Sequence, residues 1–236
     1  MALENLQKER LKKLKNLQKL GINPYPARLD SGVASLLRMT IDNARKKMGK
    51  KVVVSGRIRS LRPHGKITFT DLEDATGKIQ ILFRQDSLVG GKYDLLPNLD
   101  IGDFIGVTGE VIKTQSGEIT VDVDDFQILS KSLRPLPSSW YGLKDVEERY
   151  RRRYVDMLMN PEVRQTLEYR SRITSAIRNF LINKKGYFEV ENPVLQPIYG
   201  GTRARPFKTH HNSLDMNLYL RTSNEQIGRA SCRERV

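Results

Sequence analysis

The 236-residue sequence is poor in cysteine, histidine and tryptophan, and it has no long apolar run. Its single cysteine, Cys232, excludes an internal disulfide and a cysteine-based zinc site, so packing alone must hold the fold. The chain has no stretch of about 18 to 20 apolar residues, which excludes a membrane-spanning helix. Its first residues also lack the apolar block of a secretory signal. We therefore expect a cytoplasmic protein with no membrane partner.

Acidic residues are also few relative to basic ones. The chain has 27 Asp and Glu against 41 Lys and Arg, which gives a formal net charge of +14. Such an excess favours a polyanionic partner, most often nucleic acid, although many basic surfaces are simply well solvated. The hydrophobic fraction of 38% suffices for modest cores, and the length allows one or two globular units.

Residues 1–50 are expected to form a basic helix and a lead-in to the next domain. Between residues 3 and 20, leucines recur at helical spacing with lysine and arginine between them, which predicts an amphipathic helix. Gly21 and the prolines after it end this helix. The leucine face is expected to pack, and the basic residues are candidates for contacts with phosphate groups.

Residues 51–131 change to a period of two. Five β-rich runs between residues 51 and 129 are separated by turns that contain glycine, at 75–78 and 115–118. A longer stretch between the third and fourth runs leaves room for a short helix. This pattern predicts a small closed barrel of the OB-fold type, a fold that also binds oligonucleotides.

The remaining residues predict an α+β multidomain chain. Residues 132–159 are predicted to form a linker that contains a basic run. A helix is expected from Pro161 to about Lys184, and Gly186 is expected to end it. Two β-like segments follow, YFEVENPVLQPI and LYLRTS. Residues 160–226 therefore resemble the start of an α/β domain that lacks enough elements to bury a core.

Three barrel residues are suited to bind one unstacked base. Phe69 offers an aromatic face, Gln80 an amide for the Watson–Crick edge, and Arg62 a guanidinium for a phosphate or carbonyl group. Alternation places Phe69 on the same face as Ile67, but it leaves open whether that face is the barrel core or its surface.

A family resemblance is carried by motifs that run through the chain in order. They are LQKLGINPYP, GRIRSLRPHGKITFTDLEDATGKIQ, KTQSGEITV, LRPLP, RYRRRYVDM and GGTRARPFKTHHNSLDMNLYLR. Together they resemble the bacterial class II lysyl-tRNA synthetases, and the last three favour that family over the aspartyl and asparaginyl enzymes. The resemblance implies an N-terminal helix and OB-fold anticodon-binding domain, followed by the start of a class II catalytic domain. A stand-alone OB-fold module for tRNA or single strands, and an aspartyl or asparaginyl synthetase, are the alternatives.

The resemblance also implies site residues. Arg62, Phe69 and Gln80 correspond to residues that contact the central uridine of the lysine anticodon. Gly201 corresponds to a residue beside the lysine substrate, and Glu225 to one that binds the α-amino group of lysine. A carboxylate is a natural partner for an ammonium group, and glycine permits close approach of a ligand to the backbone.

The segment KKGYFEVENPVL resembles class II motif 1, with Gly186 and Pro193 at the homodimer interface of the family. Family motifs 2 and 3, which bind ATP and Mg²⁺, are not among these residues. The resemblance thus implies that the longer parent activates lysine with ATP and transfers it to tRNA(Lys). These residues alone are expected to be catalytically inactive and to retain anticodon binding.

Two further features are expected to carry no chemistry of their own. His210 and His211 are adjacent on a strand and point to opposite faces, so we expect no metal site. Residues 227–236 do not resemble the family, and their back-translation reads as one frame of a short-read sequencing adapter. We expect this segment to be a non-native tail that packs against nothing; a genuine basic tail is the alternative.

Overall fold

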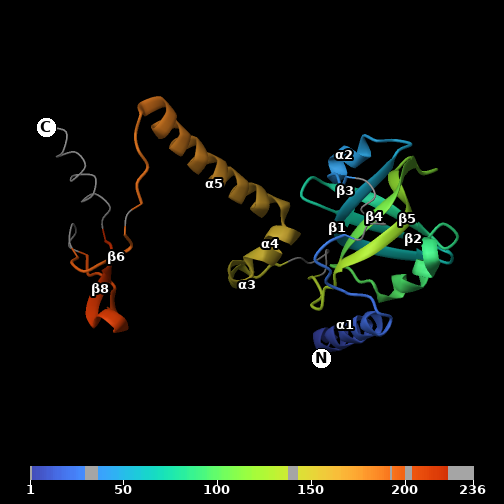
Figure 1. Cartoon of the computed structure of the whole chain (residues 1–236), viewed down its shortest axis with the longest axis horizontal. Helices are drawn as coiled ribbons and strands as arrows, with labels where there is room; N and C mark the ends of the chain where they lie inside the picture. The colour runs from blue at the N-terminus through green and yellow to red at the C-terminus, as the bar shows by residue number, and fades with distance from the viewer. Residues whose placement is uncertain (1, 30–36, 138–142, 192, 200–203, 223–236) are drawn as a thin grey trace. The chain divides into compact units, whose positions relative to one another are not determined.

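A computed structural model describes residues 2–29, 37–137, 143–191, 193–199 and 204–222. Gly201, Glu225 and the predicted adapter-derived tail lie outside the described residues. The chain divides into two compact units, Met1–Asn160 and Pro161–Val236. Each unit is described by itself, and Figure 1 colours both by residue number.

The first unit contains the predicted five-stranded barrel (Figure 1). Its strands close in the order β1-β2-β3-β5-β4, with β3 and β5 parallel and the other neighbouring pairs antiparallel. A short helical segment, η1 (Val89–Asn98), follows the third strand, as predicted. The strands are β1 (Lys51–His64), β2 (Ile67–Glu73), β3 (Lys78–Arg84), β4 (Phe104–Lys113) and β5 (Ile119–Ser130). The OB-fold prediction is confirmed.

The barrel core forms from alternate residues of each strand, because successive side chains point to opposite faces. On β2 the buried residues are Thr68, Thr70 and Leu72, while Phe69 is only half-buried. Across the core, the rings of Phe83 and Phe126 meet edge to face with centroids 5.3 Å apart. The side of β2 that carries Phe69 is therefore the outer surface of the barrel, which answers the question that alternation left open.

One buried polar side chain in this core has no partner. The side chain of Thr70 is fully buried, and its hydroxyl oxygen has no hydrogen-bond partner among the described residues. A buried hydroxyl without a partner costs about 1–3 kcal/mol of stability.

Replacing Thr70 by valine is therefore expected to stabilise the barrel by about 1 kcal/mol, because a methyl group of nearly the same size replaces an unpaired hydroxyl. Urea unfolding of the variant and the parent measures this difference. A lower midpoint for Thr70→Val would show that the hydroxyl is satisfied.

The N-terminal helix α1 (Ala2–Lys19) docks on the barrel through one narrow face. Leu17 is fully buried, and Arg10 is only 8% exposed. The Arg10 guanidinium donates to the carbonyl oxygens of Ser132, Arg134 and Ile101 at 3.0, 3.2 and 2.9 Å. The helix prediction is confirmed, but Arg10 anchors the helix and is not a free phosphate contact.

A buried ion-pair network extends this anchor. Lys13 of α1 donates to Asp100 at 2.7 Å, and Asp100 also accepts from Lys131. Lys131 donates to Asp103 at 2.8 Å, and both of these side chains are 0% exposed. Asp103 further accepts from the backbone N–H groups of Asp100 and Ser132. The network ties α1 to the end of β5 and the turn before β4.

Three short helices complete the first unit: α2 (Ile41–Arg45), α3 (Val146–Arg151) and α4 (Arg153–Met159). The predicted linker therefore contains α3 and α4.

Asp156 of α4 is fully buried and accepts hydrogen bonds from Arg149, Arg153 and Asn160. Burial alone would raise the pKa of this carboxyl, but the hydrogen bonds from Asn160 and Arg149 outweigh it and lower the pKa below its ordinary value.

The second unit begins with a long helix, α5 (Pro161–Asn179), which continues into a π-helical turn, η2 (Phe180–Lys184). A three-stranded sheet follows in the order β6-β8-β7, with a short turn η3 (Asn212–Leu214). Its strands are β6 (Leu195–Gln196), β7 (Lys208–His211) and β8 (Met216–Leu220). The prediction that residues 187–198 are β-like is largely wrong, because only Leu195 and Gln196 of the described residues in this segment pair in a sheet. No described residue from 161 onward is buried.

Candidate nucleic-acid interface

The three predicted base-binding residues lie on one patch of the barrel surface. Arg62 near the end of β1 is the register partner of Phe69 on β2. Gln80 on β3 is the register partner of Asp71, two residues beyond Phe69 on the same face. Strand pairing thus brings together residues that are up to 18 positions apart in the sequence. We call Arg62, Phe69 and Gln80 the reading face.

Phe69 provides the aromatic surface of the reading face. It is half-buried, and its cross-strand neighbour Leu82 is 3% exposed. The ring of His64 approaches Phe69 edge-on, with centroids 6.4 Å apart. A partly exposed aromatic ring on an OB-fold surface is suited to stack on an unpaired base.

Arg62 is held by a fork of hydrogen bonds. Its two terminal nitrogens donate to the two oxygens of Asp71 at 2.8 and 2.9 Å. Ser60 completes the cluster, since its hydroxyl accepts from Arg62 at 2.7 Å and donates to Asp71. The hydrogen bond from Arg62 lowers the pKa of the Asp71 carboxyl, and the same bond raises the pKa of Arg62. A bidentate pair of this kind fixes the plane of the guanidinium.

Because the folded-state pKa of Asp71 is lowered, the pair stabilises the fold above the ordinary pKa of the carboxyl, and this contribution is lost as the pH falls through the lowered value. Replacing Arg62 by alanine is expected to raise the pKa of Asp71 toward its ordinary value. An NMR titration of the Asp71 carboxyl measures the change. An unchanged pKa in Arg62→Ala would show that the pair does not persist in solution.

Both the NH₂ group and the carbonyl oxygen of the Gln80 side chain form hydrogen bonds within the protein. Its Nε2 donates to Oε2 of Glu118 at 2.9 Å, and its Oε1 accepts from the buried hydroxyl of Thr120 at 2.8 Å. Thr120 is the register partner of Gln80 across the parallel β3–β5 pair. Glu118 and Thr120 are the partners of this amide among the described residues, which leaves one N–H and one carbonyl lone pair for a ligand.

Acidic side chains outnumber the one cation of the reading face. The Arg62 cation lies beside the carboxylate of Asp71, and Glu118 is close enough to raise the pKa of Arg62 further. Two carboxylates next to one cation disfavour a phosphate group as the ligand of this patch. The arrangement suits the uncharged edge of a base, and the phosphates of the same strand require other basic residues.

Sequence reasoning missed four residues of this patch. Ser60 and Asp71 share the period-two alternation of Arg62 and Phe69, so the strand pattern contained a signal for them. Glu118 and Thr120 lie about 40 positions from Gln80 and reach it only through the parallel β3–β5 pairing. No local sequence pattern predicts the contact of Glu118 and Thr120 with Gln80.

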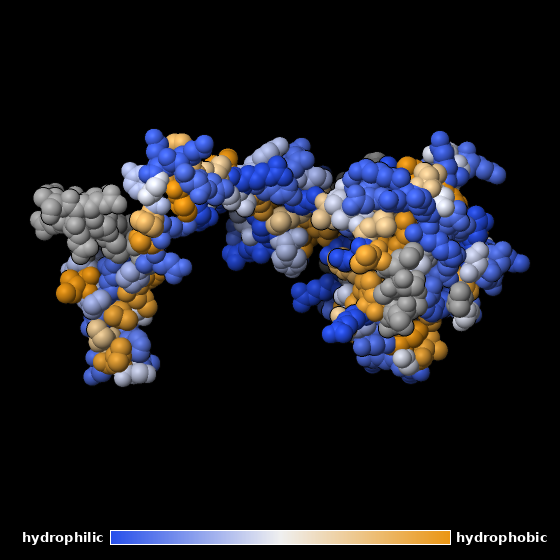
Figure 2. Space-filling model, turned by 45° about the horizontal axis from the view of Figure 1, so that its top comes forward, coloured by the Kyte–Doolittle hydropathy of each residue, from blue (hydrophilic) through white to orange (hydrophobic). Residues whose placement is uncertain are grey.

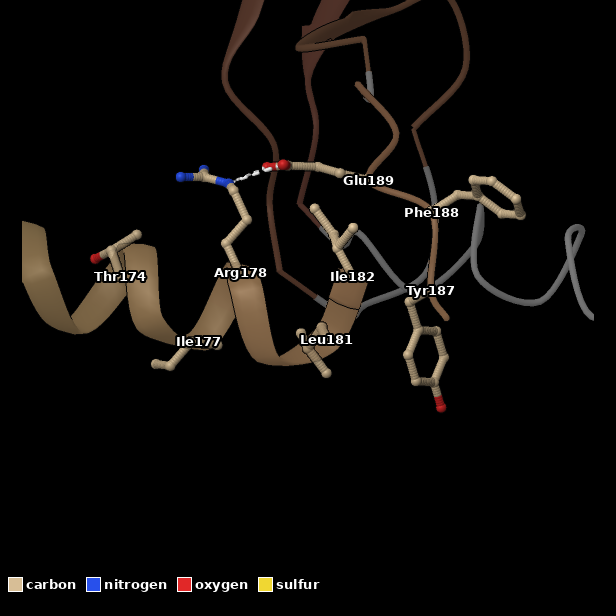
Figure 3. Close-up of a pocket in the computed structure, with 8 residues that line it drawn as sticks. All are labelled: Thr174, Ile177, Arg178, Leu181, Ile182, Tyr187, Phe188 and Glu189. Carbon is tan, nitrogen blue, oxygen red and sulfur yellow. Dashed lines mark hydrogen bonds and ion pairs between the residues drawn. The ribbon is translucent and has the colours of Figure 1, made fainter. Parts of the chain in front are cut away.

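The predicted motif 1 segment follows α5 in the second unit. Gly186 has a φ of +72°, the left-handed conformation that ends the helix, and Pro193 is exposed. Figure 3 shows a pocket here, in which Arg178 points to Glu189 and pairs with it at 2.8 Å. The pocket is lined mainly by apolar side chains of η2 and the last turns of α5, with Tyr187 and Phe188. Figure 2 shows that apolar side chains are exposed on this unit.

The two histidines have local partners. His210 lies 3.5 Å from Asp215, and Nδ1 of His211 accepts from the backbone of Leu214. Among the described residues no three histidine, cysteine or acidic side chains are close enough to share a metal ion. The same part of the chain contains no helix long and apolar enough to cross a membrane.

Comparison with known proteins matches both units. Residues 52–129 match the family described as "OB-fold nucleic acid binding domain", and residues 145–229 match "tRNA synthetases class II (D, K and N)". The second match reaches residue 229, inside the segment predicted to be non-native.

Similar curated proteins share one name. The chain is 53% identical to the lysine–tRNA ligase of Carboxydothermus hydrogenoformans over 94% of its length, and 50% identical to that of Syntrophomonas wolfei over 95%. The identity to the lysine–tRNA ligase of Halalkalibacterium halodurans is 45%, also over 95% of the chain. The aligned region spans 45%, 45% and 46% of these relatives. The chain is therefore similar to lysine–tRNA ligases over nearly all of its own length, and it spans about 45% of the length of these relatives.

Proposed function

We propose that the barrel unit binds the anticodon loop of tRNA(Lys) and that the reading face contacts the central uridine. The observation that carries the proposal is the convergence of an aromatic ring, an amide and a guanidinium from three adjacent strands. Each supplies a different part of base recognition: Phe69 stacks, Gln80 bonds the Watson–Crick edge, and Arg62 donates to a carbonyl oxygen.

The net charge of the chain supports the same partner. The formal charge of the chain is +14, whereas at the reading face the two carboxylates of Asp71 and Glu118 outnumber the Arg62 cation. Phosphate contacts would then come from basic residues elsewhere, and they would give affinity without sequence preference. Phosphate contacts would thus supply most of the affinity, and the reading face would supply the discrimination between bases.

Binding of the chain to an RNA hairpin with a lysine anticodon loop tests the proposal. We expect a preference of about 10- to 100-fold for a central uridine over a central cytidine at fixed salt, because one good bidentate contact discriminates by about 1–3 kcal/mol. Fluorescence anisotropy with two hairpins that differ only in that base measures the ratio. Equal affinities would overturn the proposal.

We further propose that the second unit is part of a lysine-activating domain. In this proposal the complete protein joins lysine to ATP as lysyl-adenylate and transfers the lysyl group to tRNA(Lys). Gly201 beside lysine and Glu225 on its α-amino group are the proposed contacts, and both lie outside the described residues. Among the described residues, no three histidine, cysteine or acidic side chains are grouped closely enough to hold Mg²⁺.

These 236 residues by themselves are proposed not to activate lysine. The family resemblance assigns the ATP phosphates and Mg²⁺ to motifs 2 and 3, which are not among these residues, so the groups expected to stabilise the transferring phosphorus would be missing. Lysine-dependent exchange of pyrophosphate into ATP tests this point. We expect no exchange above background, and robust exchange would contradict the proposal.

The apolar face around Gly186 and Pro193 is proposed to pack against a second copy of the chain. Ile177 at 57% and Phe188 at 86% exposure leave apolar surface that a monomer rarely exposes in one place. Sedimentation velocity tests the assignment. We expect a dimer for the parent chain and a monomer for Ile177→Glu, and a monomeric parent would contradict it.

A further inference from the structure

The orientation of the Gln80 amide decides which base fits the reading face. Uracil presents a donor at N3 and an acceptor at position 4, whereas cytosine presents an acceptor at N3 and a donor at position 4. A glutamine amide in one orientation matches uracil, and the same amide turned by 180° matches cytosine. If Phe69 holds the base in one place, discrimination requires that the amide cannot turn.

The structure contains a group that fixes this orientation. A carboxylate accepts hydrogen bonds but cannot donate them, so Oε2 of Glu118 must face the NH₂ group of Gln80, 2.9 Å away. The carbonyl oxygen of Gln80 then faces Thr120, whose hydroxyl donates to it at 2.8 Å. The Thr120 hydroxyl can donate or accept and would tolerate either orientation. Glu118 is therefore the partner that selects one.

The backbone of Glu118 is itself held in place. Its N–H donates to the hydroxyl of Thr114 at 3.1 Å, and its carbonyl accepts from the N–H of Thr114 at 3.0 Å. These bonds close the tight turn between β4 and β5, in which Gly117 has a φ of +87°. The carboxylate thus extends from a constrained turn toward β3.

We propose that Glu118 is a positioning residue that sets base discrimination by locking the Gln80 amide in the orientation that fits uracil. The inference rests on the proposed contact between the reading face and the central uridine. Glu118 acts through Gln80, and it needs no contact of its own with the RNA.

Replacing Glu118 by glutamine tests whether Glu118 fixes the orientation of the Gln80 amide, because the variant side chain has nearly the same shape but can donate or accept a hydrogen bond. The preference of the parent for central uridine over cytidine is expected to fall from about 10- to 100-fold to about threefold or less in Glu118→Gln. The ratio of the two affinities is used because the lost negative charge strengthens binding to both hairpins equally. Glu110→Gln, an exposed acid on β4 beside Lys51, controls for charge and is expected to keep the parent ratio.

A second background separates a positioning role from a direct contact. In the Gln80→Ala background, adding Glu118→Gln is expected to leave the ratio of the affinities for the uridine and cytidine hairpins unchanged, because there is no amide left to orient. A ratio that still changes in this background would overturn the inference, as would a parent-like ratio in Glu118→Gln alone. Absence of any preference in the parent would instead refute the proposed function.

Discussion

Replacing Asp103 by alanine is expected to lower the free energy of unfolding of the barrel unit by about 3–5 kcal/mol. The substitution removes one of the two carboxylates that pair with the buried Lys131 and leaves two backbone N–H groups without their acceptor. Asp103 and Lys131 are both 0% exposed and lie 2.8 Å apart. Asp103 also satisfies the backbone N–H groups of Asp100 and Ser132. The substitution removes all three bonds and loosens the network that anchors α1.

An exposed ion pair of the same helix is the matched control. Lys12 and Glu9 pair at 2.7 Å, but their side chains are 70% and 60% exposed. Glu9→Ala is expected to change stability by less than about 0.5 kcal/mol, because solvent screens such pairs. Urea unfolding followed by circular dichroism measures both variants. Similar losses for the two would contradict a buried anchor at Asp103.

Replacing Phe69 by alanine is expected to weaken binding to the lysine anticodon hairpin by about 5- to 150-fold, because stacking on an aromatic ring contributes about 1–3 kcal/mol per base. Phe69 is outside the barrel core, so the variant is expected to fold. Phe69→Tyr keeps the flat ring and is expected to bind like the parent. Fluorescence anisotropy measures the affinities.

Phe104→Ala separates stacking from a general loss of aromatic surface. Phe104 is also half-buried, but it begins β4 and lies under the guanidinium of Arg57, 4.3 Å from its ring centroid. Its replacement is expected to leave RNA affinity unchanged. Parent-like binding by Phe69→Ala, or an equal loss in Phe104→Ala, would remove Phe69 from the interface.

The barrel was predictable because its strands carry a period-two pattern with buried residues on one face and glycine in the turns. The same alternation placed Phe69 with Ile67, but it left open which face was the core. Only the assembled barrel shows that Thr68 and Thr70 point inward, since polar threonines at core positions run against the usual hydrophobic pattern.

The remaining differences arise from contacts between distant residues. The charge of Arg10 favoured a phosphate contact. In the structure its guanidinium instead donates to three backbone carbonyl oxygens that lie about 90 to 125 positions away in the sequence. Glu118 reaches Gln80 only because β3 and β5 pair in parallel to close the barrel. The mostly apolar residues 187–190 suggested a strand, yet strand formation needs a neighbour. Of the described residues between 187 and 198, only Leu195 and Gln196 pair in a sheet, with β8.

In the proposed function, Gln80 distinguishes the central base of the lysine anticodon. A double-mutant cycle tests it most directly, with Gln80→Ala in the protein and uridine to cytidine at that base in the hairpin. We expect a coupling energy of about 1–3 kcal/mol, so that the preference for uridine nearly disappears in Gln80→Ala. Additive effects, with the same preference for uridine in both proteins, would contradict it.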